Sequence, residues 1–253
     1  MKIPKGVLKL FPLFILLFLW HTAANAGLWS SYVLPSPEQV VITGWSMLKK
    51  GELLSALTIS LWRIVVGFSC SLFLAFLLSF LFVLKPRIRE ALEGIFNMLR
   101  HIPPISLIPL LILWFGIGET PKIIVIVLAS FFPILLNIDA GLAGCDKKLL
   151  EVGLVMGFSK KKILRTIMLP YALPHILVGM RIGLGYCLRA IIGAEMIAAA
   201  NGLGYLILDS QTMSRSDKVI VGIIFIGLLG LLIDKLFSLM LKHFVPYSQE
   251  IQQ

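Results

Sequence analysis

The chain has 253 residues, of which 58% are hydrophobic and only 14% are charged, and its formal net charge is +10. A soluble domain of this length would need a larger polar surface, so the composition excludes an ordinary soluble protein and predicts a polytopic membrane protein. The positive charge does not indicate nucleic acid binding, because much of it lies in short loops, where it orients membrane spans.

The first apolar segment covers residues 7–24; Lys2 and Lys5 precede it and Lys9 lies near its start. It imitates a secretory signal peptide, because basic residues, an apolar run and the sequence Ala24-Asn25-Ala26 occur in the expected order. The apolar run is near the upper length limit for such a peptide, and we expect it to be kept as an anchor helix. Residues 1–57 are therefore predicted to form this anchor and an external segment, in which residues 34–38 open a short helix.

Five further segments approach or exceed the roughly 20 apolar residues that cross a bilayer, and the third of the six spans is interrupted by prolines. These segments cover residues 58–84, 91–115, 123–143, 171–199 and 219–241. The sequence thus predicts an all-α fold with about six transmembrane helices, a permease core over residues 58–243 and a cytoplasmic tail over residues 244–253. Lysine and arginine gather in the N-terminus and in the loops 85–89 and 147–165, which predicts that these loops and both termini are cytoplasmic.

The loop 145–170 carries six cations and is longer than a simple connection needs. It is predicted to form two short helices, residues 147–156 and 159–168, with Gly157 at the junction, where a positive φ lets the chain turn. Gly153 would leave a flat patch for a partner, Glu151 could pair with a cation, and Pro170 would end the second helix. From these residues alone, a docking loop and a plain solvated basic loop are equally reasonable interpretations.

No motif for catalysis is present. The sequence contains no phosphate-binding Gly-x-x-x-x-Gly-Lys-Ser/Thr, no His-Glu-x-x-His and no Gly-x-Ser-x-Gly. The four histidines are scattered, and the three cysteines suggest neither a metal site nor a disulfide framework. We therefore expect no catalytic residue, no metal and no cofactor in this chain, so that the energy for any transport comes from another subunit or from an ion gradient.

Ionisable residues inside predicted spans are expensive in lipid and indicate function. A cationic path for an anionic solute, and next to it an external gate of two glycines, are the functional interpretations. The alternatives are arginines that cap broken helices or pair with Glu195, and glycines that only terminate a helix. The path would use Arg63, Arg100, Pro103, Arg181 and Glu195, and the gate Gly202 and Gly204.

The cytoplasmic loop resembles the EAA loop of bacterial ABC-importer permeases. The resemblance rests on Glu151-Val152-Gly153, on Gly157, and on Ile167 followed by Leu169-Pro170, although the family usually has alanines in place of Val152 and Gly153. In that family the loop couples the permease to the ATP-hydrolysing subunit, which implies coupling roles for Glu151, Val152, Gly153, Gly157, Leu169 and Pro170.

Other segments, in matching order over most of the chain, are similar to the permeases of the nitrate, sulfonate and taurine importer group. They include Ser60-Leu61-Trp62-Arg63, Arg100-His101-Ile102-Pro103, Glu195-Met196 and Gly202-Leu203-Gly204. The resemblance implies a homodimer in the bacterial inner membrane, two ATP-binding subunits that hold ATP and magnesium, and an external solute-binding protein. Its cargo would be a sulfonate-, taurine- or nitrate-like anion. A thiamine-precursor-like or aromatic solute, or a gradient-driven secondary transporter, remains as an alternative.

Overall fold

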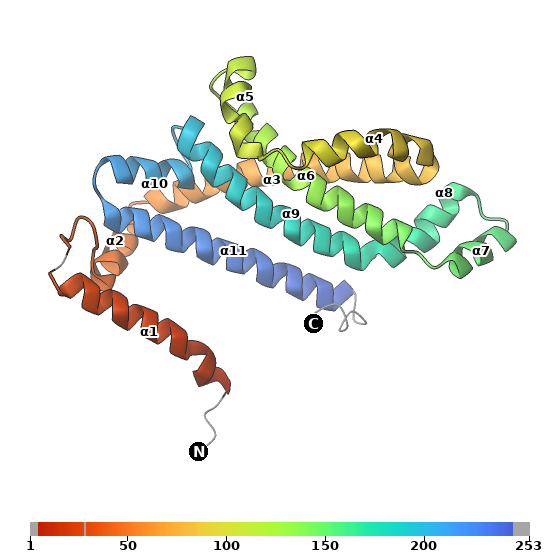
Figure 1. Cartoon of the computed structure of the whole chain (residues 1–253). Helices are drawn as coiled ribbons and strands as arrows, with labels where there is room; N and C mark the ends of the chain where they lie inside the picture. Colours follow the sequence, from red (N-terminus) through yellow and green to blue (C-terminus); the bar gives the residue numbers. More distant parts are fainter. Residues whose placement is uncertain (1–4, 28, 245–253) are drawn as a thin grey trace.

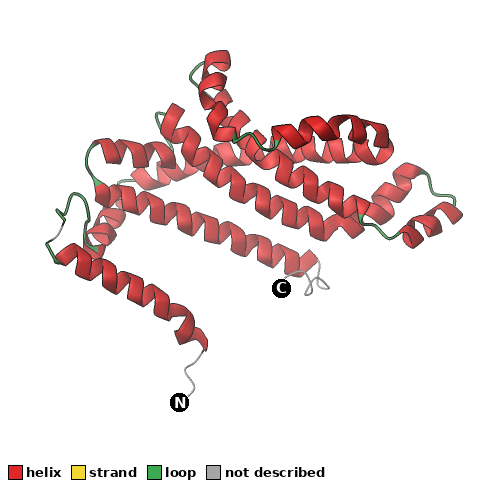
Figure 2. Ribbon diagram, viewed as in Figure 1, coloured by secondary structure: helices red, strands yellow, loops and turns green. Residues whose placement is uncertain are grey.

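The structure is a computed structural model that describes residues 5–27 and 29–244, and these residues form helices and connecting loops without any strand (Figure 2). The expected tail, residues 244–253, lies outside the described residues except for its first residue. The helices are α1 (Lys5–Asn25), α2 (Pro37–Lys49), α3 (Glu52–Leu84), α4 (Pro86–Leu99), η1 (Pro104–Leu107), α5 (Ile108–Phe115), α6 (Glu119–Ala143), α7 (Lys147–Val155), α8 (Lys160–Ile163), η2 (Leu164–Met168), α9 (Leu169–Ala198), α10 (Leu203–Thr212) and α11 (Ser216–Phe244).

The centre of the molecule is formed by α3, α6 and α9, which pack along one another, with α11 beside α9 (Figure 1). Glycines bring these helices close together. A Cβ atom on Gly67 would lie 2.6 Å from Ile126, and Cβ atoms on Gly179 and Gly183 would lie 2.6 Å from Asn137 and Ile134. Such close approach is the usual way in which membrane helices gain packing energy. Gly179 and Gly183 therefore allow tight packing, whereas Gly185 faces open space.

The two ends of the bundle differ. Helices α7 and α8 project from one end, whereas α2 and α10 lie at the other (Figure 1). The predicted short external helix is α2, which begins at an N-cap, Ser36, whose side chain accepts a hydrogen bond from the Gln39 amide at 3.3 Å. Helix α1 stands apart from the bundle and is attached near α2, where the Trp20 indole donates to the Pro35 carbonyl at 3.0 Å.

Four helices are long and apolar enough to cross a membrane: α3, α6, the continuous helix Lys160–Ala198, and α11. The expected third span is a bent pair, because Pro86–Leu99 and Pro104–Phe115 meet at 83°. The cause is Pro103-Pro104, since a residue before proline is forced out of the helical region, and Pro103 is extended with ψ 121°. The apolar part of α1, Phe11–Asn25, is shorter than these spans. The structure therefore gives four or five spans by length and composition, and the expected six require α1 as well.

Candidate functional site

Helix α7 and the turn at Gly157 are as the sequence predicts, whereas the predicted second helix, 159–168, continues into α9 as one helix, Lys160–Ala198. Asp146 caps α7 by accepting a hydrogen bond from the Lys148 amide at 2.9 Å, and Ser159 caps α8 in the same way. Gly157 joins them with φ +72°, a conformation that favours glycine. Beside the cap, burial raises the pKa of the Cys145 thiol above its ordinary value, so this cysteine stays protonated and is a poor nucleophile.

Two expectations for this loop are wrong. Gly153 is buried and faces inward, because a Cβ there would lie 2.8 Å from Ile167 and 3.1 Å from Ile163. Its small size therefore lets α7 pack on its own neighbour, and it offers no flat patch to a partner. Pro170 does not end a helix, since it lies in the first turn of α9. The preceding π-helical turn η2 changes the hydrogen-bonding register. Proline lacks a backbone N–H, and in the first turn of a helix this group would have no partner, so Pro170 is tolerated there.

The outer side of α7 is apolar and exposed. Leu154 is 62% exposed, Val155 89% and Met156 64%, and the carboxylate of Glu151 lies on the surface nearby. Leu149 and Val152 are also about half exposed. A helix at the end of the bundle that presents contiguous apolar side chains next to charged residues has the character of a protein-binding surface. We call Leu149, Glu151, Val152, Leu154, Val155 and Met156 the α7 surface.

At the opposite end, Arg63 lies in a network of ion pairs and hydrogen bonds. Its side chain is 1% exposed, and its Nη1 donates to Glu195 Oε1 at 2.7 Å, while Nε and Nη2 donate to Glu119 at 2.6 and 2.8 Å. Asn201 accepts two further bonds, at its carbonyl oxygen and its side-chain oxygen, at 2.9 and 2.6 Å. Lys122 completes the balance of charge by donating to Glu119 at 2.8 Å.

Glu195 is fully buried and its carboxylate is well satisfied. Besides Arg63, Ser60 Oγ lies 2.8 and 2.9 Å from its two oxygens, and the Gly204 amide donates to it at 2.9 Å. Gly202 has φ +111°, and a Cβ on it would lie 2.4 Å from the Glu195 carboxylate. Both predicted gate glycines therefore sit directly against Glu195, where only glycine allows the backbone to approach this closely.

We call these contacting residues the outer network, because they lie at the end of the bundle opposite α7 and α8. The network joins α3, the start of α6, the end of α9 and the start of α10. Sequence reasoning named Arg63, Glu195 and the two glycines, but it missed the other partners, Ser60, Glu119, Lys122 and Asn201. Two of these carried a signal in the sequence: Ser60 stands in the segment Ser60-Leu61-Trp62-Arg63, and Lys122 is a charge near the start of an apolar segment, where it is 4% exposed.

Arg181 has a different partner. It donates to Asp234 Oδ1 of α11 at 2.8 Å, and both side chains are partly exposed. The sequence places Arg181 and Glu195 near one face of a helix, yet in the structure each pairs with another helix. Arg181 therefore joins α9 to α11 and does not belong to the outer network.

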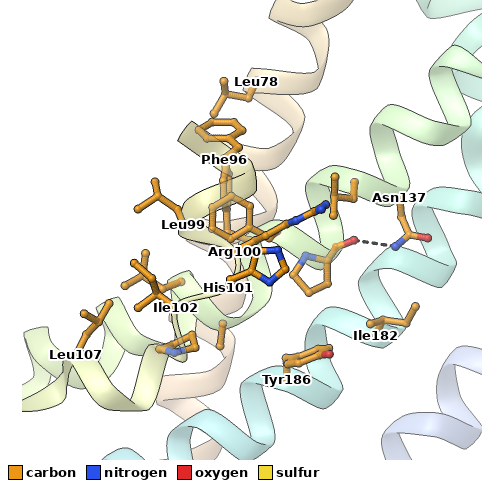
Figure 3. Close-up of a pocket in the computed structure, with 17 residues that line it drawn as sticks. Leu78, Phe96, Leu99, Arg100, His101, Ile102, Leu107, Asn137, Ile182 and Tyr186 are labelled. Carbon is orange, nitrogen blue, oxygen red and sulfur yellow. Dashed lines mark hydrogen bonds between the residues drawn. The ribbon is translucent and has the colours of Figure 1, made fainter. Parts of the chain in front are cut away.

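Arg100 lies at the break between the helices α4 and η1. It follows α4, is exposed, and lines a cavity of about 640 Å³ together with the adjacent His101. In Figure 3 both side chains lie between the end of α4 and the part of α6 that carries Asn137, and Tyr186 of α9 lies on another side. Pro103, also predicted here, creates the break but is not among the lining residues. The break after α4, helix α6 and helix α9 thus surround the charged side chain of Arg100 in this cavity.

The described residues contain no group of three or more histidine, cysteine, aspartate or glutamate side chains that could hold a metal ion. The side chains described above offer charge pairing and apolar contact. The long apolar helices, the cavity beside a broken helix and the projecting α7 surface are those of a polytopic membrane protein with a surface for a partner.

Comparison with known proteins shows the family. Residues 67–246 match the model of binding-protein-dependent transport system inner membrane components, and the chain belongs to this family. It is 35% identical to SsuC of Bacillus subtilis, named as an aliphatic sulfonates transport permease, over 94% of this chain and 86% of that one. It is 32% identical to the taurine permease TauC of Escherichia coli over 94% and 88% of the two chains. With the nitrate permease NrtB of Synechocystis it shares 30% identity over 98% and 92%.

Solved structures agree on the fold. An amino acid ABC transporter has a TM-score of 0.66 at 18% identity, covering 79% of this chain and 97% of that one. The inward-facing MetNI methionine ABC transporter has a TM-score of 0.64 at 20% identity, covering 77% and 98%. The expected all-α fold and the resemblance to ABC-importer permeases are thus confirmed, and the fold is that of a type I importer permease. The chain is an integral inner-membrane permease subunit and not an enzyme, and its family works with an ATP-binding partner and a solute-binding protein.

Proposed function

We propose that this permease passes a small anion of the sulfonate, taurine or nitrate kind from an external binding protein to the cytoplasm by alternating access. The observation that carries the proposal is the cavity at the α4–α5 break, where Arg100 and His101 face a wall that contains no acidic residue. The names of the relatives, which include sulfonate, taurine and nitrate permeases, point to the same kind of cargo.

We further propose that two copies of the chain assemble with two ATP-binding subunits, which hold the ATP and the magnesium, so that this chain needs no cofactor. The α7 surface would be the contact with those subunits, and both termini would lie on the same cytoplasmic side. This orientation is supported by the cations Lys147, Lys148, Lys160, Lys161, Lys162 and Arg165, which surround the two projecting helices.

The structure offers a direct route from the α7 surface to the cavity. Gly153 seats α7 on Ile163 and Ile167, and these residues begin a continuous helical segment, Lys160–Ala198. That segment is about 58 Å long at 1.5 Å per residue, lines the cavity with Tyr186, and carries Glu195 at its far end. Closure of the ATP-binding subunits would move α7, and the long helix would carry this movement to the cavity and to the outer network. In this scheme Gly202 and Gly204 belong to the external gate, because they hold α10 against Glu195.

Reconstitution in proteoliposomes with the ATP-binding subunits and the binding protein tests the proposal. We expect uptake that requires ATP and is insensitive to protonophores, and we expect Glu151→Lys to abolish stimulation of ATP hydrolysis by the loaded binding protein. The matched control is Glu90→Lys, at an exposed carboxylate near the start of α4 that is not part of the α7 surface. Uptake that follows a proton gradient without ATP, or full coupling in Glu151→Lys, would contradict the proposal.

A further inference from the structure

The cavity at the α4–α5 break has one uncompensated positive charge. Seventeen residues line it, and none of them is aspartate or glutamate. Arg100 takes part in no ion pair within the described part of the chain, whereas Arg63 and Arg181 each contact a carboxylate. Because the arginine side chain cannot lose its proton in a protein, this charge is available to a bound anion.

Part of the cavity wall is aromatic. Phe96, Phe131 and Phe132 contact one another with ring centroids 5.1 to 6.2 Å apart at steep angles. Edge-to-face clusters of this kind are well packed and offer an apolar surface. One N–H of the Asn137 amide donates to the Pro133 carbonyl at 2.8 Å (Figure 3), and most of the other lining residues are apolar. The wall therefore suits an apolar group better than a polar one.

We propose that this cavity accepts organic anions with an apolar body, such as alkyl or aryl sulfonates, and discriminates against zwitterions and bare inorganic anions. This inference rests on the proposed function and narrows its cargo. A sulfonate can accept paired hydrogen bonds from the Arg100 guanidinium while its hydrocarbon part lies against the phenylalanines. The ammonium of a zwitterion would be repelled by the Arg100 guanidinium and would meet no carboxylate in the lining to offset that repulsion. A bare anion such as nitrate would leave the aromatic wall without a contact.

Direct binding to the permease–ATPase complex in lipid nanodiscs, without the binding protein, tests the cavity itself. Isothermal titration calorimetry would compare benzenesulfonate, 1-propanesulfonate, taurine and nitrate. Taurine and 1-propanesulfonate form the sharpest pair, because they differ by an ammonium in place of a methyl group on the same sulfonate chain. We expect both apolar sulfonates to bind at least about tenfold more tightly than taurine or nitrate.

Variants test separately the charged side of the cavity, at Arg100, and its aromatic side, at Phe132. Arg100→Gln should weaken both sulfonates by about tenfold or more, whereas Arg87→Gln, an exposed arginine at the start of the same helix that does not line the cavity, should change neither. Phe132→Ala should weaken benzenesulfonate more than 1-propanesulfonate. Phe132→Leu, which keeps most of the volume, should show the same order if the alanine variant fails to fold.

Taurine binding as tight as that of 1-propanesulfonate, no binding of any probe, or unchanged affinity in Arg100→Gln would overturn the inference. ATP-dependent uptake by the complete importer separates this failure from failure of the proposed function. If uptake of any of these anions persists while the cavity shows no preference, only the cargo inference falls. If the complete importer shows no ATP-dependent uptake, the proposed function itself falls.

Discussion

Removal of the Glu195 carboxylate tests the outer network most severely. The substitution Glu195→Ala leaves the Arg63 charge buried with one carboxylate partner in place of two, and leaves the Gly204 amide without its acceptor. Breaking a buried ion pair from one side costs about 3–5 kcal/mol, and an orphaned buried donor costs about 1–3 kcal/mol. Because Glu119 still neutralises Arg63, we expect a loss of about 4 kcal/mol in the free energy of unfolding.

The measurement is the Tm of the purified permease in nanodiscs, followed by tryptophan fluorescence. At about 2–4 °C per kcal/mol for a chain of this size, Glu195→Ala should lower the Tm by about 8–16 °C. The isosteric Glu195→Gln should lower it by less, since its amide oxygen can still accept one bond. The control Glu90→Ala, at an exposed carboxylate, should stay within about 2 °C of the parent protein.

A double-mutant cycle isolates the pair. In Arg63→Met with Glu195→Met both charges are gone, and Glu119 keeps Lys122 as its partner at 2.8 Å. The double variant should therefore be more stable than the sum of the two single losses predicts. A Tm for Glu195→Ala no lower than that of Glu90→Ala, or strictly additive losses in the cycle, would refute the assignment of Glu195 to a buried ion pair.

Three further predictions concern the α7 surface and the glycine turns. Val155→Asp places a charge at an 89% exposed apolar position, so recovery of the ATP-binding subunit with the tagged permease should fall about tenfold or more, with the Tm unchanged. The equally exposed Ile117→Asp, at the other end of the bundle, should leave recovery intact, and equal loss in both would argue against docking at α7. Gly157→Ala forces alanine to φ +72° and should cost about 1–2 kcal/mol and reduce coupled ATP hydrolysis. Gly51→Ala, at φ +73°, should cost the same in Tm but leave coupling unchanged; parallel loss of coupling would contradict a specific role of the α7–α8 turn. Gly202→Ala brings a Cβ within 2.4 Å of a buried carboxylate at φ +111°, and should cost about 2–4 kcal/mol in the same melting assay. A Tm equal to that of the parent protein would show that the backbone at Gly202 does not pack against Glu195 as described.

Several features could be predicted from local sequence because they depend on neighbouring residues. The apolar segments, the break at Pro103-Pro104 and the turn at Gly157 follow from hydrophobic length, from the fixed geometry of proline and from the freedom of glycine at positive φ. The family could be recognised in the same way, since its motifs are short and keep their order along the chain.

The partners of the charged residues were decided only by the tertiary structure. Helical spacing predicts that Arg181 and Glu195 lie near one face of α9, but it does not give their partners, Asp234 and Arg63, which lie 53 and 132 positions away. Gly153 is a second case in which the sequence does not give the contact. A small residue allows close approach by a partner protein or by the chain itself, and only the structure shows that Ile163 and Ile167 fill this space. The sequence by itself determined which segments are helical and apolar and where the chain turns. Which side chains meet was fixed by helix packing, because ion pairs depend on distances of about 3 Å between segments far apart in the chain.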